Sequence, residues 1–416
     1  MTAMDQSLDE GFLELISASV EDPRPFYARL REQAPAFRTS LGFWYVTRYD
    51  LAMEIVRDPR GWVNSPPDGK RAHHRDGYAL DLWYRAFMYL DGPEHKHMRG
   101  LVGELATPRF VNALRGAVGS AVSDQFDELA GRESFDFRHD FAELLPTKVI
   151  MRILGLDEAE LPRLLAVAQS IASMLEPLVD DATIERGDAI WRGAAEFVLA
   201  TADERRRAPK ADLLTTLVRR VDAEDGLGDE DLLSLVFFLA VSGHETTANM
   251  LSNGLYHLLT HDLVGELRAE PDLLSSAVEE LLRYEAPPRN SVARYPLSDV
   301  VLGGETIRRG EPVYVGYQAA NHDPAEFEDP LRLDLRRSPN RHVGFGIGVH
   351  HCLGAALSRL ELTSALRELL VRCDDLGLGR EPVTWMPGFV IRGLNHVPVH
   401  STPVRSGSSR IGGSDD

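Results

Sequence analysis

Cys352 has the most distinctive chemical setting of any residue in the sequence. It closes a short loop, Phe345-Gly346-Ile347-Gly348-Val349-His350-His351-Cys352-Leu353-Gly354, and a helical pattern of apolar residues follows directly. A cysteine just before a helix N-terminus lies near the positive end of the helix dipole and near free backbone N–H groups, which both favour the thiolate. A thiolate on a tight, glycine-rich loop suits axial ligation of haem iron. The alternative is a buried structural cysteine, the commoner role of an unpaired thiol.

A second group of polar residues lies inside a long apolar helical pattern that runs from Asp229 to His261. Its centre reads Leu239-Ala240-Val241-Ser242-Gly243-His244-Glu245-Thr246-Thr247, which places an acid beside an alcohol among apolar residues. Buried polar side chains cost free energy unless they are paired. The alternative to a functional pair is that the threonine hydroxyls bond back to the preceding helical turn. A zinc-protease site is excluded, because the fourth residue after His244 is Ala248 and not a second histidine.

Two further pairs of residues occur at helical spacing. Glu280 and Arg283 lie three apart in a predicted helix from Leu273 to Tyr284, and His95 and Arg99 lie four apart in the chain. The members of each pair therefore share one helix face. Without other information, the first pair would be a surface ion pair of little energetic value, and the second would be exposed basic residues.

The elements that position these residues can be predicted from hydrophobic periodicity. Helices are expected at 22–32 and 49–57, strands at 43–47, 300–302 and 312–315, and alternating helical runs and acidic turns over 110–225. Residues 60–90 are expected to be irregular. Residues 401–416, rich in Ser, Gly and Asp, are expected to form a disordered tail. No internal repeat is found.

Composition narrows the class of protein. The chain has 416 residues, 44% of them hydrophobic, and a formal net charge of −19, which disfavours nucleic acid and anionic membrane as partners. No segment provides the roughly 20 apolar residues that span a bilayer, and the N-terminus has no signal region. With only two cysteines the chain is not a disulfide scaffold. We therefore expect a cytoplasmic protein.

The cysteine loop, residues 345–354, resembles the haem-binding loop of the cytochrome P450 family, Phe-Gly-x-Gly-x-His-x-Cys-x-Gly, at every fixed position. The resemblance extends over nearly the whole chain and implies the mainly α cytochrome P450 fold, a helical prism with a small β-rich lobe. It implies one haem domain over residues 1–400, with haem b as the cofactor. Cys352 would be the iron ligand, and Phe345, Gly346, His350 and Gly354 would shape the haem site.

The resemblance also assigns roles to the other polar residues. In the family, the long helix crosses the distal face of the haem, so Glu245 and Thr246 would deliver protons and Gly243 would open the helix for dioxygen. His95, Arg99, Arg294 and His350 would bind the haem propionates. Glu280 and Arg283 would form a structural triad with Arg332.

Function follows from the same resemblance. It implies a soluble bacterial monooxygenase of secondary metabolism that inserts one oxygen atom into a small organic substrate, free or tethered to a carrier protein. Electrons would come from NAD(P)H through ferredoxin reductase and ferredoxin, and the protein would be a monomer. Oxidative coupling and non-catalytic haem binding are the alternatives.

Two surfaces are expected on the same grounds. The expected substrate pocket draws on residues from four segments: Tyr84, Phe87, Met88, Phe238, Leu239, Ser242, Asn290, Ser291, Val292 and Val390. The expected ferredoxin-docking patch consists of basic residues around the cysteine face: Lys96, Arg99, Arg109, Arg115, Arg341 and Arg359.

Overall fold

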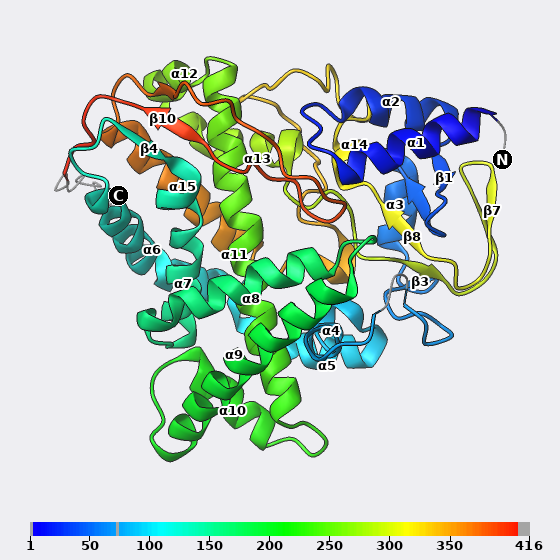
Figure 1. The fold of residues 1–416 in the computed structure, drawn as a ribbon, viewed down its shortest axis with the longest axis horizontal. Coiled ribbons are helices and arrows are strands. Elements are labelled where there is room, and N and C mark those ends of the chain that lie inside the picture. Colours follow the sequence, from blue (N-terminus) through cyan, green and yellow to red (C-terminus); the bar gives the residue numbers. More distant parts are fainter. Residues whose placement is uncertain (1–2, 72–74, 407–416) are drawn as a thin grey trace.

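The computed structural model of the protein describes residues 3–71 and 75–406. One long helix, α11 (Asp229–Thr260), runs through the middle of a helical assembly, and most of the strands gather in a smaller lobe beside α1 (Ala3–Ser17), as Figure 1 shows. This arrangement matches the expected mainly α architecture with a small β-rich lobe.

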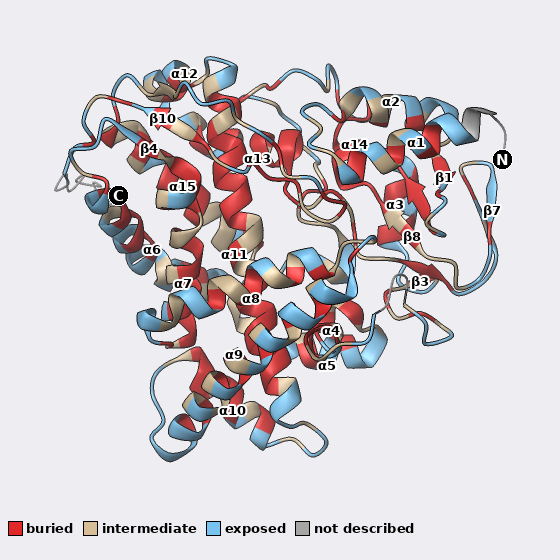
Figure 2. Ribbon diagram, in the orientation of Figure 1, coloured by how far each residue is buried: buried red, intermediate tan, exposed pale blue. Residues whose placement is uncertain are grey.

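Helix α11 is central because it is apolar on nearly all sides. Its first turn carries Asp229, Glu230 and Asp231, which favour the positive end of the helix dipole. The stretch from Leu232 to Val241 is buried throughout, and Figure 2 shows α11 largely buried while α6 and α10 each expose one face. A helix that is hydrophobic all round belongs inside a protein. Four helices pack closely against it: α7 (Leu144–Leu154), α8 (Leu161–Met174), α13 (Leu274–Glu285) and α15 (Ala355–Arg372).

The other α helices described are shorter or lie toward the outside. They are α2 (Arg24–Gln33), α3 (Tyr49–Arg57), α4 (Tyr78–Tyr84), α5 (Gly92–Gly100), α6 (Pro108–Glu128), α9 (Asp181–Arg207), α10 (Leu213–Asp222), α12 (Val264–Ala269) and α14 (Tyr317–Asn321). A π-helical turn, η3 (Arg138–Ala142), precedes α7. None of the described helices is long and apolar enough to cross a membrane.

The strands form small sheets that join distant parts of the chain. Strands β1 (Ala36–Arg38), β2 (Trp44–Val46) and β8 (Val313–Val315) make one sheet, with β2 and β8 parallel and Trp44 opposite Val313. The remaining strands are β4 (Ser134–Asp136) with β10 (Pro398–His400) and β9 (Gly377–Leu378), β3 (Trp62–Val63) with β5 (Tyr295–Pro296), and β6 (Val300–Leu302) with β7 (Glu305–Ile307). A further bridge pairs Arg294 with Val313, so the β lobe fixes the segment that carries Arg294.

Most predicted elements are confirmed, and two expectations are wrong. Helix α4 lies in the segment predicted to be irregular. Its first backbone N–H groups, those of Tyr78 and Ala79, donate to the Asp188 carboxylate of α9, a long-range cap that local sequence does not reveal. Residues 401–406 are not disordered, because the Val404 backbone bonds to Gly131 and Arg132. The rest of the predicted tail, 407–416, lies outside the described residues.

Candidate haem-thiolate site

The cysteine loop is closed by a hydrogen bond from the Cys352 backbone N–H to the Phe345 carbonyl, at 2.9 Å. Gly346 and Gly348 have φ values of +64° and +77°, a region that favours glycine. A Cβ atom on Gly348 would also lie 2.8 Å from the Val56 carbonyl oxygen. The two glycines therefore let the loop turn tightly and bring Cys352 to the start of α15.

The Cys352 side chain is accessible to solvent. Many protein atoms nevertheless lie around it, and desolvation by these atoms is the largest influence on its pKa. Both observations hold if the thiol faces an internal space. Desolvation raises the pKa of the thiol above its ordinary value, against the opposing effects of the Gly354 backbone N–H, Arg99 and Arg359. The expectation of a favoured thiolate is thus wrong for the thiol by itself, because burial outweighs the helix terminus. Coordination to a metal ion deprotonates a thiol outright.

Four basic side chains, His95, Arg99, Arg294 and His350, form what we call the basic cluster. The His95 and His350 ring centroids lie 4.3 Å apart, and Arg294 and Arg99 interact electrostatically with both imidazoles. Arg99 donates to the His351 carbonyl at 2.7 Å, which ties the cluster to the cysteine loop. Residues from α5, from the chain before β5 and from the cysteine loop therefore converge beside Cys352.

Three nitrogens of the basic cluster have no hydrogen-bond partner among the described residues. His95 Nε2, Arg294 Nε and His350 Nδ1 are buried without a hydrogen-bond partner, and unsatisfied buried polar atoms are rare in proteins. Burial, together with the charges of His350 and Arg99, lowers the pKa of His95 to about 4. One carboxylate, Asp91, lies near the cluster, 3.8 Å from His350 Nε2. Anionic groups beside the basic cluster would accept hydrogen bonds from the unpartnered nitrogens. The two propionates of haem are anionic groups of this kind.

On α11, the acid and the alcohol occur as expected, and both are partly exposed. Thr246 Oγ1 donates to the Ser242 carbonyl at 2.8 Å, so its lone pairs remain free to accept a hydrogen bond. Thr247 Oγ1 lies 3.4 Å from Ser358 Oγ of α15. This contact brings the polar centre of α11 next to the helix that follows Cys352.

Three residues around Glu245 were not foreseen from the sequence. Asn249 Nδ2 donates to Glu245 Oε1 at 2.8 Å, Arg138 Nη1 donates to Asn249 Oδ1 at 2.6 Å, and Arg138 Nη2 lies 2.8 Å from a Glu143 carboxylate oxygen. Asn249 lies one helical turn after Glu245, so its spacing could have identified it. Arg138 and Glu143 are about 100 residues away, and no local pattern identifies them.

The expected role of Gly243, opening the helix for dioxygen, stays a prediction. Helix α11 is continuous from 229 to 260, so the glycine does not interrupt it. The nearest atoms to a Cβ there would be those of Ile150 of α7, at ordinary contact distances of 3.8 Å or more. The neighbouring Ser242 is partly exposed, with its carbonyl engaged by Thr246.

The structural triad needs one correction. Glu280 and Arg283 are fully buried and form two hydrogen bonds of 2.8 Å. The third member is Arg337, whose Nε lies 3.1 Å from both Glu280 oxygens. Arg332 is exposed and contributes only its carbonyl oxygen, which accepts from Arg283. Several arginines follow one another between 332 and 337, and the motif spacing selected the wrong one.

The expected substrate residues divide into two groups. Phe87 packs against Phe238 with ring centroids 4.8 Å apart, and Asn290 Nδ2 donates to the Phe389 carbonyl at 2.6 Å, next to Val390. Ser291 does not belong to the pocket. It is buried, and both its hydroxyl and its backbone N–H bond to the Val315 backbone of β8, because alternate residues of an extended segment face opposite sides. Met88, Leu239 and Val292 are buried or half-buried, and the Met88 carbonyl accepts a hydrogen bond from Asn64 Nδ2 at 2.6 Å.

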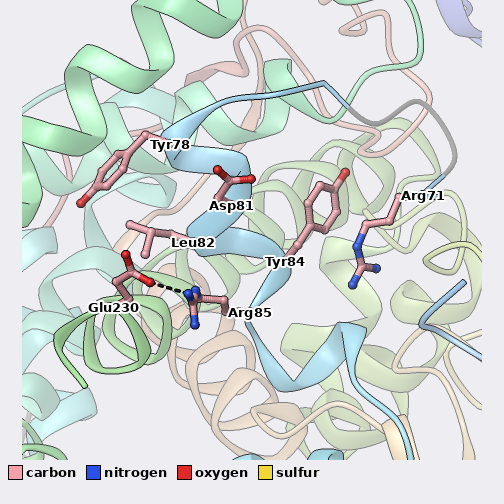
Figure 3. A pocket seen from close by; sticks show the side chains of 7 residues that line it. All are labelled: Arg71, Tyr78, Asp81, Leu82, Tyr84, Arg85 and Glu230. Carbon is pink, nitrogen blue, oxygen red and sulfur yellow. Dashed lines mark hydrogen bonds and ion pairs between the residues drawn. The ribbon is translucent and has the colours of Figure 1, made fainter. Parts of the chain in front are cut away.

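A cavity of about 450 Å³ opens beside α4 (Figure 3). Of the expected substrate residues, only Tyr84 lines this cavity. The other residues that line it are Arg71, Tyr78, Asp81, Leu82, Arg85 and Glu230. The Arg71 guanidinium lies 4.7 Å from the centre of the Tyr84 ring. Burial raises the pKa of Tyr84 to about 12, so its hydroxyl stays protonated at neutral pH. The cavity is more polar than the aromatic group around Phe238.

Glu176, in the turn between α8 and α9, was also missed. Its carboxylate accepts hydrogen bonds from the backbone N–H groups of Phe389 at 2.7 Å and Val390 at 3.1 Å. Desolvation raises the pKa of Glu176 above the ordinary value of a carboxyl. These hydrogen bonds connect the turn between α8 and α9 to the segment that contains Val390, one of the expected substrate residues.

Comparison with known proteins decides the family. Residues 185–376 match the family model of cytochrome P450. The chain is 36% identical to the cytochrome P450 monooxygenase PikC of Streptomyces venezuelae, over 99% of this chain and 98% of the relative. The chain belongs to the cytochrome P450 family.

Solved structures agree with this assignment. The structure of the myxobacterial cytochrome P450 CYP267B1 with myristic acid superposes with a TM-score of 0.87 at 34% identity, over 94% of this chain and 99% of that one. P450BioI, solved with an acyl carrier protein that carries hexadec-9Z-enoic acid, gives a TM-score of 0.84 at 32% identity, over 92% and 99%. The chain is therefore a haem-thiolate P450 of the monooxygenase class.

Proposed function

We propose that this P450 uses NAD(P)H, through ferredoxin reductase and ferredoxin, to hydroxylate or epoxidise a small organic substrate in secondary metabolism. We place it in the cytoplasm, as a monomer. The observation that carries this proposal is the set of unpartnered basic nitrogens beside an exposed cysteine, with the acid and alcohol of α11 adjacent.

Each residue has a defined part in this account. Cys352 would ligate the iron, and His95, Arg99, Arg294 and His350 would bind the propionates. Bound haem supplies oxygen activation and insertion into an unactivated bond, favoured by thiolate donation. Thr246 offers lone pairs to a proton donor, and Glu245 is the partly exposed acid beside it. Phe87 and Phe238 provide an apolar wall that orients substrate and excludes water.

The substrate class has partial support. P450BioI binds an acyl group on a carrier protein and CYP267B1 binds a fatty acid. We propose an apolar carbon chain or ring, free or carrier-bound, as substrate here. The residues that contact this substrate would include Phe238, Asn290 and their neighbours.

Turnover under labelled oxygen tests this function. The purified protein, a surrogate ferredoxin and reductase, NADPH and each compound that shifts the haem spectrum on binding are incubated under ¹⁸O₂. We expect a product that carries one labelled oxygen atom. A product without label, or turnover of none of the compounds that bind, would contradict the proposal.

Ferredoxin docking is expected to depend on Arg109. This residue is exposed in the first turn of α6, and ferredoxins are usually acidic, so a local positive surface must offset the net charge of −19. Arg359 is a poor test, although it belongs to the expected patch, because Glu279 binds it through two hydrogen bonds.

Arg109→Glu is expected to slow reduction by ferredoxin roughly tenfold at low salt. Stopped-flow reduction measures the rate, and substrate-binding spectra and peroxide-driven turnover should stay unchanged. The control is Arg207→Glu, the same charge change at the exposed end of α9. Equal rates for both variants would place the docking surface elsewhere.

A further inference from the structure

Glu176 joins two parts of the protein that have separate apolar cores. The turn between α8 and α9 lies against the core of the helical assembly, to which Val179 belongs, whereas Phe389 belongs to the core beside α1, β1 and β2. The Glu176 carboxylate bridges them by accepting from the backbone N–H groups of Phe389 at 2.7 Å and Val390 at 3.1 Å. Hydrogen bonds to an ionised group are roughly twice as strong as those between neutral groups.

The segment that Glu176 binds is the 386–393 loop. Its ends are joined by the antiparallel bridge between Trp385 and Leu394 and by a hydrogen bond from the Met386 N–H to the Gly393 carbonyl. Within the loop, Gly388 has a φ of +147°, in the region that favours glycine. A Cβ atom on Gly388 would lie 3.0 Å from Glu176 Oε1. The missing side chain therefore gives the carboxylate room to approach.

The other side of this loop binds a second part of the expected substrate pocket. The Val390 carbonyl accepts from the Arg289 backbone N–H at 3.1 Å, and the Phe389 carbonyl accepts from Asn290 Nδ2 at 2.6 Å. All four backbone polar groups of Phe389 and Val390 are thus engaged. Their carbonyls are held by residues 289–290 and their N–H groups by Glu176, so Val390 is fixed between two segments that are distant in sequence.

Burial of the Glu176 carboxylate has a cost that its partners oppose. Desolvation raises its pKa, whereas the N–H groups of Phe389 and Val390 and the charge of Arg289 act in the opposite direction. Arg289 is 1% exposed, and its Nε and Nη2 have no hydrogen-bond partner among the described residues. Arg289 therefore attracts the carboxylate without a direct hydrogen bond from these atoms. The contact depends on the two backbone N–H groups.

We propose that Glu176 is a positioning residue of the substrate pocket, which clamps the 386–393 loop to the α8–α9 turn and thereby holds Val390 against a long bound substrate. This inference deepens the proposed function and rests on the expected place of Val390 in the pocket. Glu176 contacts neither haem nor substrate in this account. It acts through the backbone of Phe389 and Val390.

The test measures how fast two azoles leave the haem-loaded ferric protein. A ring nitrogen of imidazole ligates haem iron, so 1-methylimidazole and 1-dodecylimidazole share a head group and differ in their apolar chain. Stopped-flow displacement, followed through the haem spectrum, gives both dissociation rates. From Glu176→Ala, 1-dodecylimidazole should dissociate roughly tenfold faster than from the wild type, the loss expected for one hydrogen bond to a charged group. The rate for 1-methylimidazole should not change.

Three further variants define the role of the carboxylate. Glu176→Gln keeps one acceptor oxygen and should restore part of the difference. Gly388→Ala should also speed dissociation of the long azole, because the added methyl group displaces the carboxylate. The matched control is Asp181→Asn, an acid-to-amide change at an exposed position in the first turn of α9, which should leave both rates unchanged.

Hydrogen exchange of the 386–393 loop reports the clamp itself. The N–H groups of Phe389 and Val390 should exchange faster in Glu176→Ala than in the wild type, and unchanged exchange would overturn the proposal. Faster exchange with unchanged dissociation of 1-dodecylimidazole would overturn it too, and leave Glu176 with a structural role. If Glu176→Ala does not fold, wild-type dissociation from Gly388→Ala overturns it equally.

None of these measurements uses turnover, so this inference and the proposed function fail separately. A labelled product from the ¹⁸O₂ experiment, together with unchanged dissociation of the long azole, would keep the monooxygenase function and overturn the role of Glu176. Equal affinity of the wild type for the two azoles would also overturn it, because the pocket wall would then not hold the chain.

Discussion

Arg283→Ala is expected to abolish soluble, haem-loaded protein. Arg283 is fully buried, and its guanidinium forms two hydrogen bonds with Glu280 and others with the carbonyls of Asn321, Pro330 and Arg332. Its removal takes two hydrogen bonds from Glu280, which keeps those of Arg337 and Asn340, and one hydrogen bond from each of these carbonyls. Breaking a buried ion pair in this way costs about 3–5 kcal/mol, a large part of the 5–15 kcal/mol that stabilises a typical protein.

Arg332→Ala provides the control for this prediction. The Arg332 side chain is exposed, and its carbonyl survives the substitution. This variant should express, bind haem and melt like the wild type. Soluble yield, haem content per chain and melting temperature measure both variants. A haem-loaded Arg283→Ala protein with normal melting would show that the Glu280–Arg283 pair does not stabilise the fold.

Thr246→Ala is expected to separate NADPH consumption from product formation. The lone pairs of the Thr246 hydroxyl are free to accept a hydrogen bond, because its proton is donated to the Ser242 carbonyl. Without the Thr246 hydroxyl, a proton donor has no fixed hydrogen-bond partner in the middle of α11. The electrons taken from NADPH should then reduce dioxygen to hydrogen peroxide, which is released. Loss of a positioned acid–base group costs about 10²–10⁴-fold in rate.

The measurement compares product and peroxide per NADPH in Thr246→Ala and Thr247→Val. Thr247 is the neighbouring alcohol, but it is buried and faces Ser358 of α15, so Thr247→Val should keep wild-type coupling. If Thr246→Ala formed product with full yield per NADPH, the hydroxyl would have only a packing role.

The sequence predicted those parts of the site that are encoded locally. The cysteine loop, the acid and alcohol of α11 and the Glu280–Arg283 pair are each contained within ten residues, so spacing and residue type were sufficient. The strand at 300–302 and the helix at 49–57 were predicted with their observed bounds because a short β-branched run and a helical spacing of apolar residues are both local signals.

Contacts between distant segments could not be predicted in this way. Helix α4 depends on a cap from Asp188, Glu245 depends on Arg138 through Asn249, and Glu176 binds a backbone segment 213 residues away. The desolvation of Cys352 is likewise a property of the packed protein. Each of these depends on tertiary structure, which a single sequence does not display.

The direct test of the central claim is the spectrum of the ferrous–CO complex in the wild type, Cys352→Ser and Cys373→Ser. Cys373 is the other cysteine of the chain and is buried, so its substitution is a matched control. We expect one haem b per chain and the red-shifted Soret band of thiolate ligation in the wild type and in Cys373→Ser. The band should be lost in Cys352→Ser. An unchanged band in Cys352→Ser would contradict the assignment of Cys352 as the iron ligand.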